Sequence, residues 1–317
     1  MANLADHVVA LRRALVDGTD HVDPFNGVID AGASAGPDAR TQAIRALLSG
    51  LAGAPPATLG ELAVASGALV EQGASATESL GVLLDALAAG ATSLAAAPGL
   101  ADADLDRGAA PRAMAPPARD WAGAYHRLVV GAMARLARST EARALARAHS
   151  HLDAAIRALA GRIQAWHVTY LHEVLDMLDD APLLLVDTAT DTITRLRVTG
   201  IRNCFHLITL LEGHDPFDLV GDTLSTGRGY YTWRYLGVTS DRAIDIVQTM
   251  IPGDLRARDL PAFEGTRVVV RTPTGVRRSW DTSFVAPIHD ALRSTIVTEA
   301  ELAPAAARAL RDRMAAG

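Results

Sequence analysis

The composition of the chain changes abruptly at Pro182, and this change limits the fold more than any other feature of the sequence. Residues 1–181 contain five aromatic residues and seven threonines, whereas residues 182–317 contain nine aromatic residues and 17 threonines. Aromatic and β-branched residues favour strands, while the alanine-rich part before Pro182 favours helices. We therefore expect an α+β protein: an all-helical N-terminal region followed by a small C-terminal α+β module with an antiparallel or mixed sheet.

Four segments are expected along the chain. Residues 1–96 are predicted to form a helical region with αα-hairpins, and residues 97–119, with four prolines and no apolar periodicity, a linker or long loop. Residues 120–181 are predicted to form a long antiparallel helix pair, because apolar residues recur every three or four positions in both halves. In the second half of this pair, that stripe consists of Leu152, Ile156, Leu159, Ile163, Trp166 and Tyr170. Residues 182–317 form the α+β module.

Local signals predict where several of these elements begin. Three Ser/Thr-x-x-Glu patterns are typical of capping boxes at helix starts: Thr58 with Glu61, Ser75 with Glu78, and Thr298 with Glu301. The third would open a final helix over residues 299–315. Asn203 is expected to cap a short helix over residues 204–212. Strands are predicted over residues 182–187 and 192–198, which pair, and over residues 230–236 and 265–271. After a turn at residues 272–275, residues 276–280 are expected to return as a hairpin partner.

Charge and residue usage exclude several classes of chemistry. All 30 basic residues are arginine, which excludes Schiff-base chemistry and a phosphate loop with its lysine. We attribute this lysine-free usage to a GC-rich bacterial genome. The net charge of −6 falls within residues 1–180, and residues 181–317 are neutral. Since neither half is basic, we expect no nucleic-acid partner.

Neither a membrane span nor a secretion signal is expected. No stretch of 18 or more residues is free of charges and helix breakers, and the charges near the N-terminus follow the apolar residues rather than precede them. The protein is therefore predicted to be cytoplasmic.

A group of polar residues supplies weak candidates for catalysis: Cys204, His206, His172, His214 and Asp215. Cys204 would lie at the start of a short helix, where the helix dipole lowers the pKa of a thiol. An enzyme site built from these residues would lie between the long helix and the C-terminal sheet. The alternative is that Cys204 is a small buried apolar residue.

The histidine spacings do not favour a metal. His149 and His151 would point to different faces of a helix, as would His167 and His172, and no HExxH pattern exists. We predict no metal site and no cofactor.

An aromatic and arginine-rich face is the candidate binding surface of the C-terminal module. Its members are Tyr231, Trp233, Arg234, Arg277, Arg278 and Trp280. Arginine beside aromatic rings suits a small anionic or planar ligand, or a protein partner. The alternative is a sheet face packed under the C-terminal helix, with the arginines at its edge.

Three aspartates crowd the end of the predicted long helix, at positions 176, 179 and 180. The helix dipole disfavours anions at a C-terminus. Either an arginine of the C-terminal module or a cation compensates them, or they are exposed to solvent.

Three patches resemble a family of uncharacterised proteins from GC-rich actinobacteria. Residues 200–211, GIRNCFHLITLL, are similar to a pattern GIGDNFQLHTLL, and residues 265–280 are similar to a pattern GVRVVVLDPPPYARSW. Residues 66–73, SGALVEQG, are similar to a GALVE-x-G element of the same family. The resemblance implies no activity, but it directs attention to these patches.

The chain departs from the family pattern at polar positions. Cys204, His206 and Ile208 stand where the pattern has Asn, Gln and His. A site that needs those groups would be lost or altered here.

We therefore favour a non-catalytic binding or scaffold protein, acting through its helical surface and the aromatic–arginine face. A protein partner or a homo-oligomer fits this interpretation. The alternative is a small-molecule enzyme or ligand-binding protein with a site between the long helix and the sheet.

Overall fold

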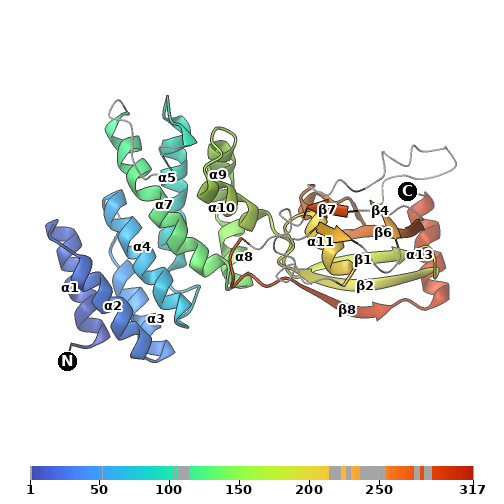
Figure 1. Ribbon diagram of the computed structural model, residues 1–317, viewed down its shortest axis with the longest axis horizontal. Coiled ribbons are helices and arrows are strands. Elements are labelled where there is room, and N and C mark those ends of the chain that lie inside the picture. Colours follow the sequence, from blue (N-terminus) through green and yellow to red (C-terminus); the bar gives the residue numbers. More distant parts are fainter. Residues whose placement is uncertain are drawn as a thin grey trace. The chain divides into compact units, whose positions relative to one another are not determined.

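The chain folds into two compact units, and each is described by itself. The computed structural model describes residues 2–51, 53–102, 105, 114–213, 223–225, 230–235, 251, 255–274, 279–281 and 288–316. The first unit spans Met1–Leu175 and the second Asp176–Gly317. The predicted α+β class is confirmed: helices make up the first unit and a mixed sheet the second (Figure 1).

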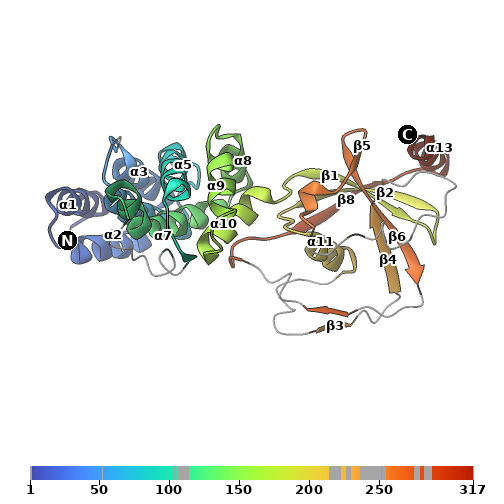
Figure 2. The same cartoon turned by 90° about the horizontal axis from the view of Figure 1, so that it is seen from above.

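The first unit is an array of helices that lie side by side (Figures 1 and 2). Its helices are α1 (Leu4–Asp17), α2 (Val22–Ser34), α3 (Pro37–Leu48), α4 (Pro56–Glu71), α5 (Leu80–Ala96), α7 (Pro116–Leu136), α8 (Thr140–Ala148), α9 (Leu152–Ala160) and α10 (Trp166–Asp176). The most extensive contact joins α4 and α7. Among the described residues, no helix is long and apolar enough to cross a membrane.

Glycines allow α4 and α7 to approach closely. A Cβ placed on Gly131 of α7 would lie 2.2 Å from the carbonyl oxygen of Ala63 on α4. A Cβ placed on Gly67 of α4 would lie 3.0 Å from the Cα of Gly131. The two backbones are therefore in direct contact, and no larger residue fits between them.

The predicted capping boxes at α4 and α5 are wrong. Helix α4 begins at Pro56, whose ring fixes φ for the first turn, so Thr58 is already inside the helix and buried. Helix α5 begins at Leu80 without a side-chain cap. Glu78 instead binds Arg45 of α3, with Oε2 2.8 Å from Nη2. The ion pair with Arg45 thus takes the place of the local capping hydrogen bonds that the sequence predicted for Glu78.

The single long helix predicted for the second half of residues 120–181 is also wrong. The chain leaves the helix at Gly161, and α10 starts only at Trp166. Arg162 donates to the carbonyl oxygen of Ala97 at 2.8 Å, and the Gln164 N–H donates to Asp102 Oδ1 at 2.8 Å. These bonds hold the connection outside helical geometry. Helix α9 consequently packs mainly on α5, rather than forming a long antiparallel pair with α7.

A mixed sheet forms the centre of the second unit. Its strands are β1 (Ala181–Asp187), β2 (Thr192–Thr199), β4 (Tyr230–Tyr235), β5 (Ala262–Phe263), β6 (Thr266–Thr274) and β8 (Thr295–Glu301). The order is β4-β6-β1-β2-β8, and β5 pairs with β6. Strands β1 and β2 are antiparallel, as predicted, whereas β1 and β6 are parallel. The two segments that were predicted as paired strands are thus confirmed.

The predicted hairpin after residue 271 is wrong. Strand β6 continues to Thr274 through the expected turn. Residues Ser279–Asp281 form β7, which pairs with β3 (Thr223–Ser225) in a separate two-stranded sheet. The local turn signal was overridden because β6 pairs along its length with β4 and β1.

One helix packs on each face of the large sheet. Helix α11 (Cys204–Leu211) packs on one face, and its cap is confirmed: the His206 N–H donates to Asn203 Oδ1 at 2.9 Å. Helix α13 (Pro304–Ala316) packs on the other through Ala307, Leu310 and Met314. The third predicted capping box is wrong, because Thr298 and Glu301 belong to β8.

The three aspartates at the C-terminal end of α10 and just after it have partners within the second unit. Asp176 is 2% exposed and binds both Arg256 and Arg258, with 2.7 Å between its Oδ2 and Arg256 Nη1. Asp179 Oδ1 accepts the Gly200 N–H at 3.0 Å, and Asp180 pairs with Arg197 at 3.2 Å. The interpretation that arginines compensate this cluster is confirmed for Asp176, whereas the side chain of Asp180 is 80% exposed, as the alternative interpretation expected.

Candidate functional site

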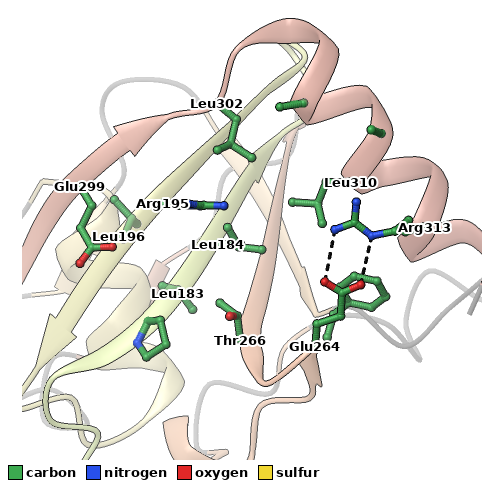
Figure 3. A pocket seen from close by; sticks show the side chains of 14 residues that line it. Leu183, Leu184, Arg195, Leu196, Glu264, Thr266, Glu299, Leu302, Leu310 and Arg313 are labelled. Atoms are coloured by element: carbon green, nitrogen blue, oxygen red, sulfur yellow. Dashed lines mark hydrogen bonds and ion pairs between the residues drawn. The ribbon is translucent and has the colours of Figure 1, made fainter.

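A pocket lies between the sheet of the second unit and α13 (Figure 3). Its volume is about 530 Å³, within the range of small-molecule sites. Strands β1 and β2 form its floor, α13 one wall, and the β5–β6 turn another. The residues that line it are Pro182, Leu183, Leu184, Arg195, Leu196, Phe263, Glu264, Thr266, Glu299, Leu302, Ala306, Ala309, Leu310 and Arg313.

Strand register places an arginine among apolar residues on the floor. Leu184 of β1 is directly opposite Arg195 of β2, so both side chains lie on the same face as α13. Val186 and Ile193, the next such pair, are buried with Leu310 beneath the helix. Arg195 lies beyond that cover and stays exposed. The floor is therefore apolar with one guanidinium above it.

A β-bulge brings a carboxylate to the same pocket. The register between β2 and β8 shifts because Arg195 pairs with Ala300 while Leu196 pairs with Thr298, which leaves Glu299 as the extra residue. A bulge of this kind redirects the side chain of its extra residue. Glu299 lines the pocket, and its Oε1 lies 2.5 Å from Arg197 Nε.

Both carboxylates of the pocket are already paired. Glu264 in the β5–β6 turn accepts two hydrogen bonds from Arg313 of α13, at 3.1 and 3.2 Å (Figure 3). Hydrogen bonding to Glu264 raises the pKa of Arg313, and hydrogen bonding to Glu299 and Asp180 raises the pKa of Arg197. Arg195, in contrast, has no hydrogen bond or ion pair from its side chain to any described residue.

The side chains that line the pocket are mainly apolar residues, arginines and glutamates. Among the described lining residues there is no histidine, cysteine or serine, and Thr266 supplies the one hydroxyl. Glu264 and Glu299 are each bound by an arginine, Arg313 and Arg197. What the lining residues offer a ligand is apolar area and the guanidinium of Arg195, which binds no other described side chain.

The predicted catalytic residues are divided between the two units and the part of the chain outside the described residues. Cys204 and His206 both lie on α11 and are buried, Cys204 completely. The backbone N–H of Arg202 donates to His206 Nδ1 at 3.4 Å. His172 lies on α10 in the helical unit. His214 and Asp215 lie outside the described residues.

The predicted aromatic–arginine face is wrong at its centre. Trp233 is 1% exposed, packs with Leu207 and Ile208 of α11, and donates its indole N–H to Glu212 Oε1 at 2.9 Å. This is the packed sheet face of the alternative interpretation, although the packing helix is α11 rather than the C-terminal one. Arg234 is half-buried.

The remaining members of that face are divided between sheets or lie outside the described part. Tyr231 belongs to β4 of the large sheet and Trp280 to β7 of the small one. Arg277 and Arg278 lie outside the described residues. The prediction of a single exposed surface is therefore contradicted at Trp233 and stays a prediction for the members whose side chains lie outside the described part.

The helical unit contains an aromatic cluster that the sequence did not indicate as a site. His126 of α7 stacks edge-on to Trp166 of α10, with ring centroids 5.2 Å apart, and lies 5.3 Å from His167. His167 is fully buried, and burial, with a smaller effect of His126, lowers its pKa to about 4. The ring is therefore neutral near pH 7. Among the described residues, no group of side chains is arranged to hold a metal ion.

Sequence reasoning missed Arg195 and Glu299. The alternating pattern of β2 placed Arg195 on one face, but no local signal distinguished it from the neighbouring Arg197. The position of Glu299 depends on a β-bulge. The bulge arises from the pairing of β2 with β8, and no residue pattern in the sequence predicts it.

Comparison of the chain with protein-family models, with curated proteins and with solved structures finds no match.

Proposed function

We propose that the protein is a non-catalytic binding protein whose α+β unit holds a small amphipathic carboxylate in the pocket between the sheet and α13. The observation that carries this proposal is Arg195. Its guanidinium has no partner among the described residues, and it lies beside an apolar lining that includes Leu184 of the floor and Leu310 of the α13 wall. The carboxylate would bind the arginine, and its apolar part would cover the leucines.

The charges around the pocket favour a single negative charge on the ligand. A planar carboxylate matches the guanidinium fork and accepts two parallel hydrogen bonds. Glu264 and Glu299 also line the pocket, so a doubly charged phosphate would meet two carboxylates as well as one free arginine. Coulomb repulsion from these carboxylates weakens the binding of a dianion more than the binding of a monoanion.

The enzyme alternative is less well supported by the same geometry. Its one candidate thiol nucleophile is Cys204 of α11, which is fully buried in the core. A substrate reaches a thiol only where the thiol is accessible. The pocket that is accessible contains no such group among its described residues.

Calorimetric titration with octanoate, octanol and octyl phosphate tests the proposal. We expect octanoate to bind most tightly. Arg195→Gln should lower the affinity for octanoate about tenfold, since a hydrogen bond to a charged group contributes about 1.5–3 kcal/mol. Arg308→Gln is the matched control, because it removes the same charge from α13 at a residue that does not line the pocket.

A second variant separates loss of charge from loss of space. Ala309→Phe should fill the pocket and abolish binding while Arg195 stays intact. The proposal fails if octanoate does not bind at millimolar concentration, or if it binds equally to the wild type and to both variants.

A further inference from the structure

A second pocket lies in the helical unit and is formed by residues of α3, α4, α5 and α7. Its volume is about 490 Å³, which is within the range of small-molecule sites. Four of its lining residues, Val82, Asp85, Ala86 and Ala89, recur at helical spacing along one face of α5. This pocket is separate from the one beside α13, because the two belong to different units of the chain.

An indole ring and two leucines complete the lining. A Cβ placed on Gly90 of α5 would lie 2.8 Å from Cε3 of Trp121, so the absence of a side chain at Gly90 lets the indole lie directly on α5. Trp121 is half-buried and belongs to the first part of α7. Leu48 at the end of α3 and Leu59 of α4 add apolar surface. The pocket is therefore largely apolar, with an aromatic ring in its wall.

Among the described residues that line this pocket, Asp85 is the only one with a charge. His149, at the end of α8, holds one oxygen of this carboxylate, with 3.0 Å between Nε2 and Oδ1. The other oxygen, Oδ2, has no partner among the described residues. The carboxylate is thus oriented by a side chain outside the pocket and keeps one oxygen for a ligand.

We propose that this pocket binds a small amphipathic cation, a primary alkylammonium ion. The ammonium group donates to Oδ2 of Asp85, and the alkyl chain covers Leu48, Leu59 and Val82. Charge complementarity supports this ligand class, because no described lining residue is an arginine that could bind an anion. The indole of Trp121 adds to the preference, since indole attracts cations more strongly than other aromatic side chains.

The exposure of Asp85 sets the expected size of this preference. Its side chain is 78% exposed, so water and salt screen its interaction with a bound cation. Ion pairs that stay in contact with water change an affinity about two- to fivefold. The apolar lining therefore supplies most of the affinity, and Asp85 selects the charge of the ligand.

Calorimetric titration with octylammonium and octanol at pH 7 tests the proposal. We expect octylammonium to bind about two- to fivefold more tightly than octanol. Asp85→Asn keeps the shape of the side chain but removes its charge, so it should lower the affinity for octylammonium by the same factor. Asp30→Asn is the matched control, because Asp30 is an exposed carboxylate of α2 that does not line the pocket. Equal effects of the two variants would overturn the proposal.

Two further variants locate the bound cation. Ala89→Phe fills the pocket at an exposed residue of α5 and should abolish binding of octylammonium, with circular dichroism as the check on folding. Ala309→Phe fills the pocket beside α13 and should leave that binding unchanged. The proposal fails if octylammonium does not bind at millimolar concentration, or if folded Ala89→Phe still binds it. Because Ala309→Phe affects the other pocket alone, this site and the proposed function can fail independently.

Discussion

Arg256 binds Asp176 across 80 residues of sequence, with 2.7 Å between Nη1 and Oδ2. Asp176 is the last residue of α10, a position where the helix dipole disfavours a carboxylate. The carboxylate is nonetheless buried, because Arg258 binds its other oxygen and Arg256 is itself held by Asp259 at 2.8 Å. The pair ties the start of the second unit to the segment before β5.

Removal of both arginines should destabilise the second unit more than removal of the carboxylate. Arg256→Gln/Arg258→Gln leaves the charge of Asp176 buried, at a cost of about 2–3 kcal/mol, the lower part of the usual range because the arginines are partly exposed. Asp176→Asn removes the buried charge itself and should cost less. Urea unfolding followed by circular dichroism measures both, with Arg308→Gln as the control for loss of an arginine. The reverse order would contradict this account.

The contact between α4 and α7 should not tolerate a methyl group at Gly131. Gly131→Ala would place its Cβ 2.2 Å from the carbonyl oxygen of Ala63, so the helices must move apart, at a cost of several kcal/mol. Gly81→Ala on α5 is the matched control, since no atom lies within 4 Å of its Cβ. That change should stabilise the helix by about 0.5–1 kcal/mol. Thermal unfolding of the two variants checks the prediction, and similar melting temperatures would refute it.

The helical unit should lose stability as the pH falls from about 6.5 to about 4. The folded state holds His167 neutral, with its pKa lowered to about 4 by burial, whereas the unfolded chain takes up a proton near pH 6.5. Stability from this residue is therefore fully present above pH 6.5 and declines by about 3 kcal/mol as the pH approaches 4.

Two histidine variants isolate this effect. His167→Gln should flatten the pH dependence of the free energy of unfolding between pH 6.5 and 4. His151→Gln, at an exposed histidine of the same unit, should leave it unchanged. Urea unfolding at pH 7, 5.5 and 4.5 provides the measurement. An unaltered slope in His167→Gln would show that another group is responsible.

Trp233 should stabilise the second unit through the hydrogen bond of its indole N–H as well as through its buried apolar area. Trp233→Phe keeps an aromatic ring in the core but removes the 2.9 Å bond to Glu212, and hydrogen bonds to charged groups contribute about 1.5–3 kcal/mol. Tyr231→Phe, on the same strand, is the comparison for a lost polar group. Equal free energies of unfolding for Trp233→Phe and the wild type would mean that the bond contributes nothing.

Local sequence patterns correctly predicted those elements that depend on interactions between neighbouring residues. The change of composition at Pro182 indicated where strands begin, and β1 and β2 lie where paired strands were predicted, over residues 182–187 and 192–198. Asn203 caps α11 because a side chain and an amide three residues later are close in any helix start. Such features need only neighbouring residues.

Local sequence patterns gave wrong predictions where a side chain binds a residue that is distant in the sequence instead of a neighbouring one. Glu78 matched a capping box but binds Arg45, and Gly161 interrupts a stripe of apolar residues because Arg162 and Gln164 bond to residues more than 60 positions away. Period counting cannot detect such bonds, because it compares residues only with their neighbours in sequence.

The sequence by itself determined the α+β class, the position of its first strands and the absence of lysine chemistry. Only the tertiary structure decided the site. Strand register put Arg195 opposite Leu184, and a bulge turned Glu299 toward the same pocket. The same pairing buried Trp233 and left Val297 at an open edge. The physical reason is that the pairing of a strand decides which of its side chains are buried and which of its edges stays exposed, and the residues that pair with it lie far along the chain.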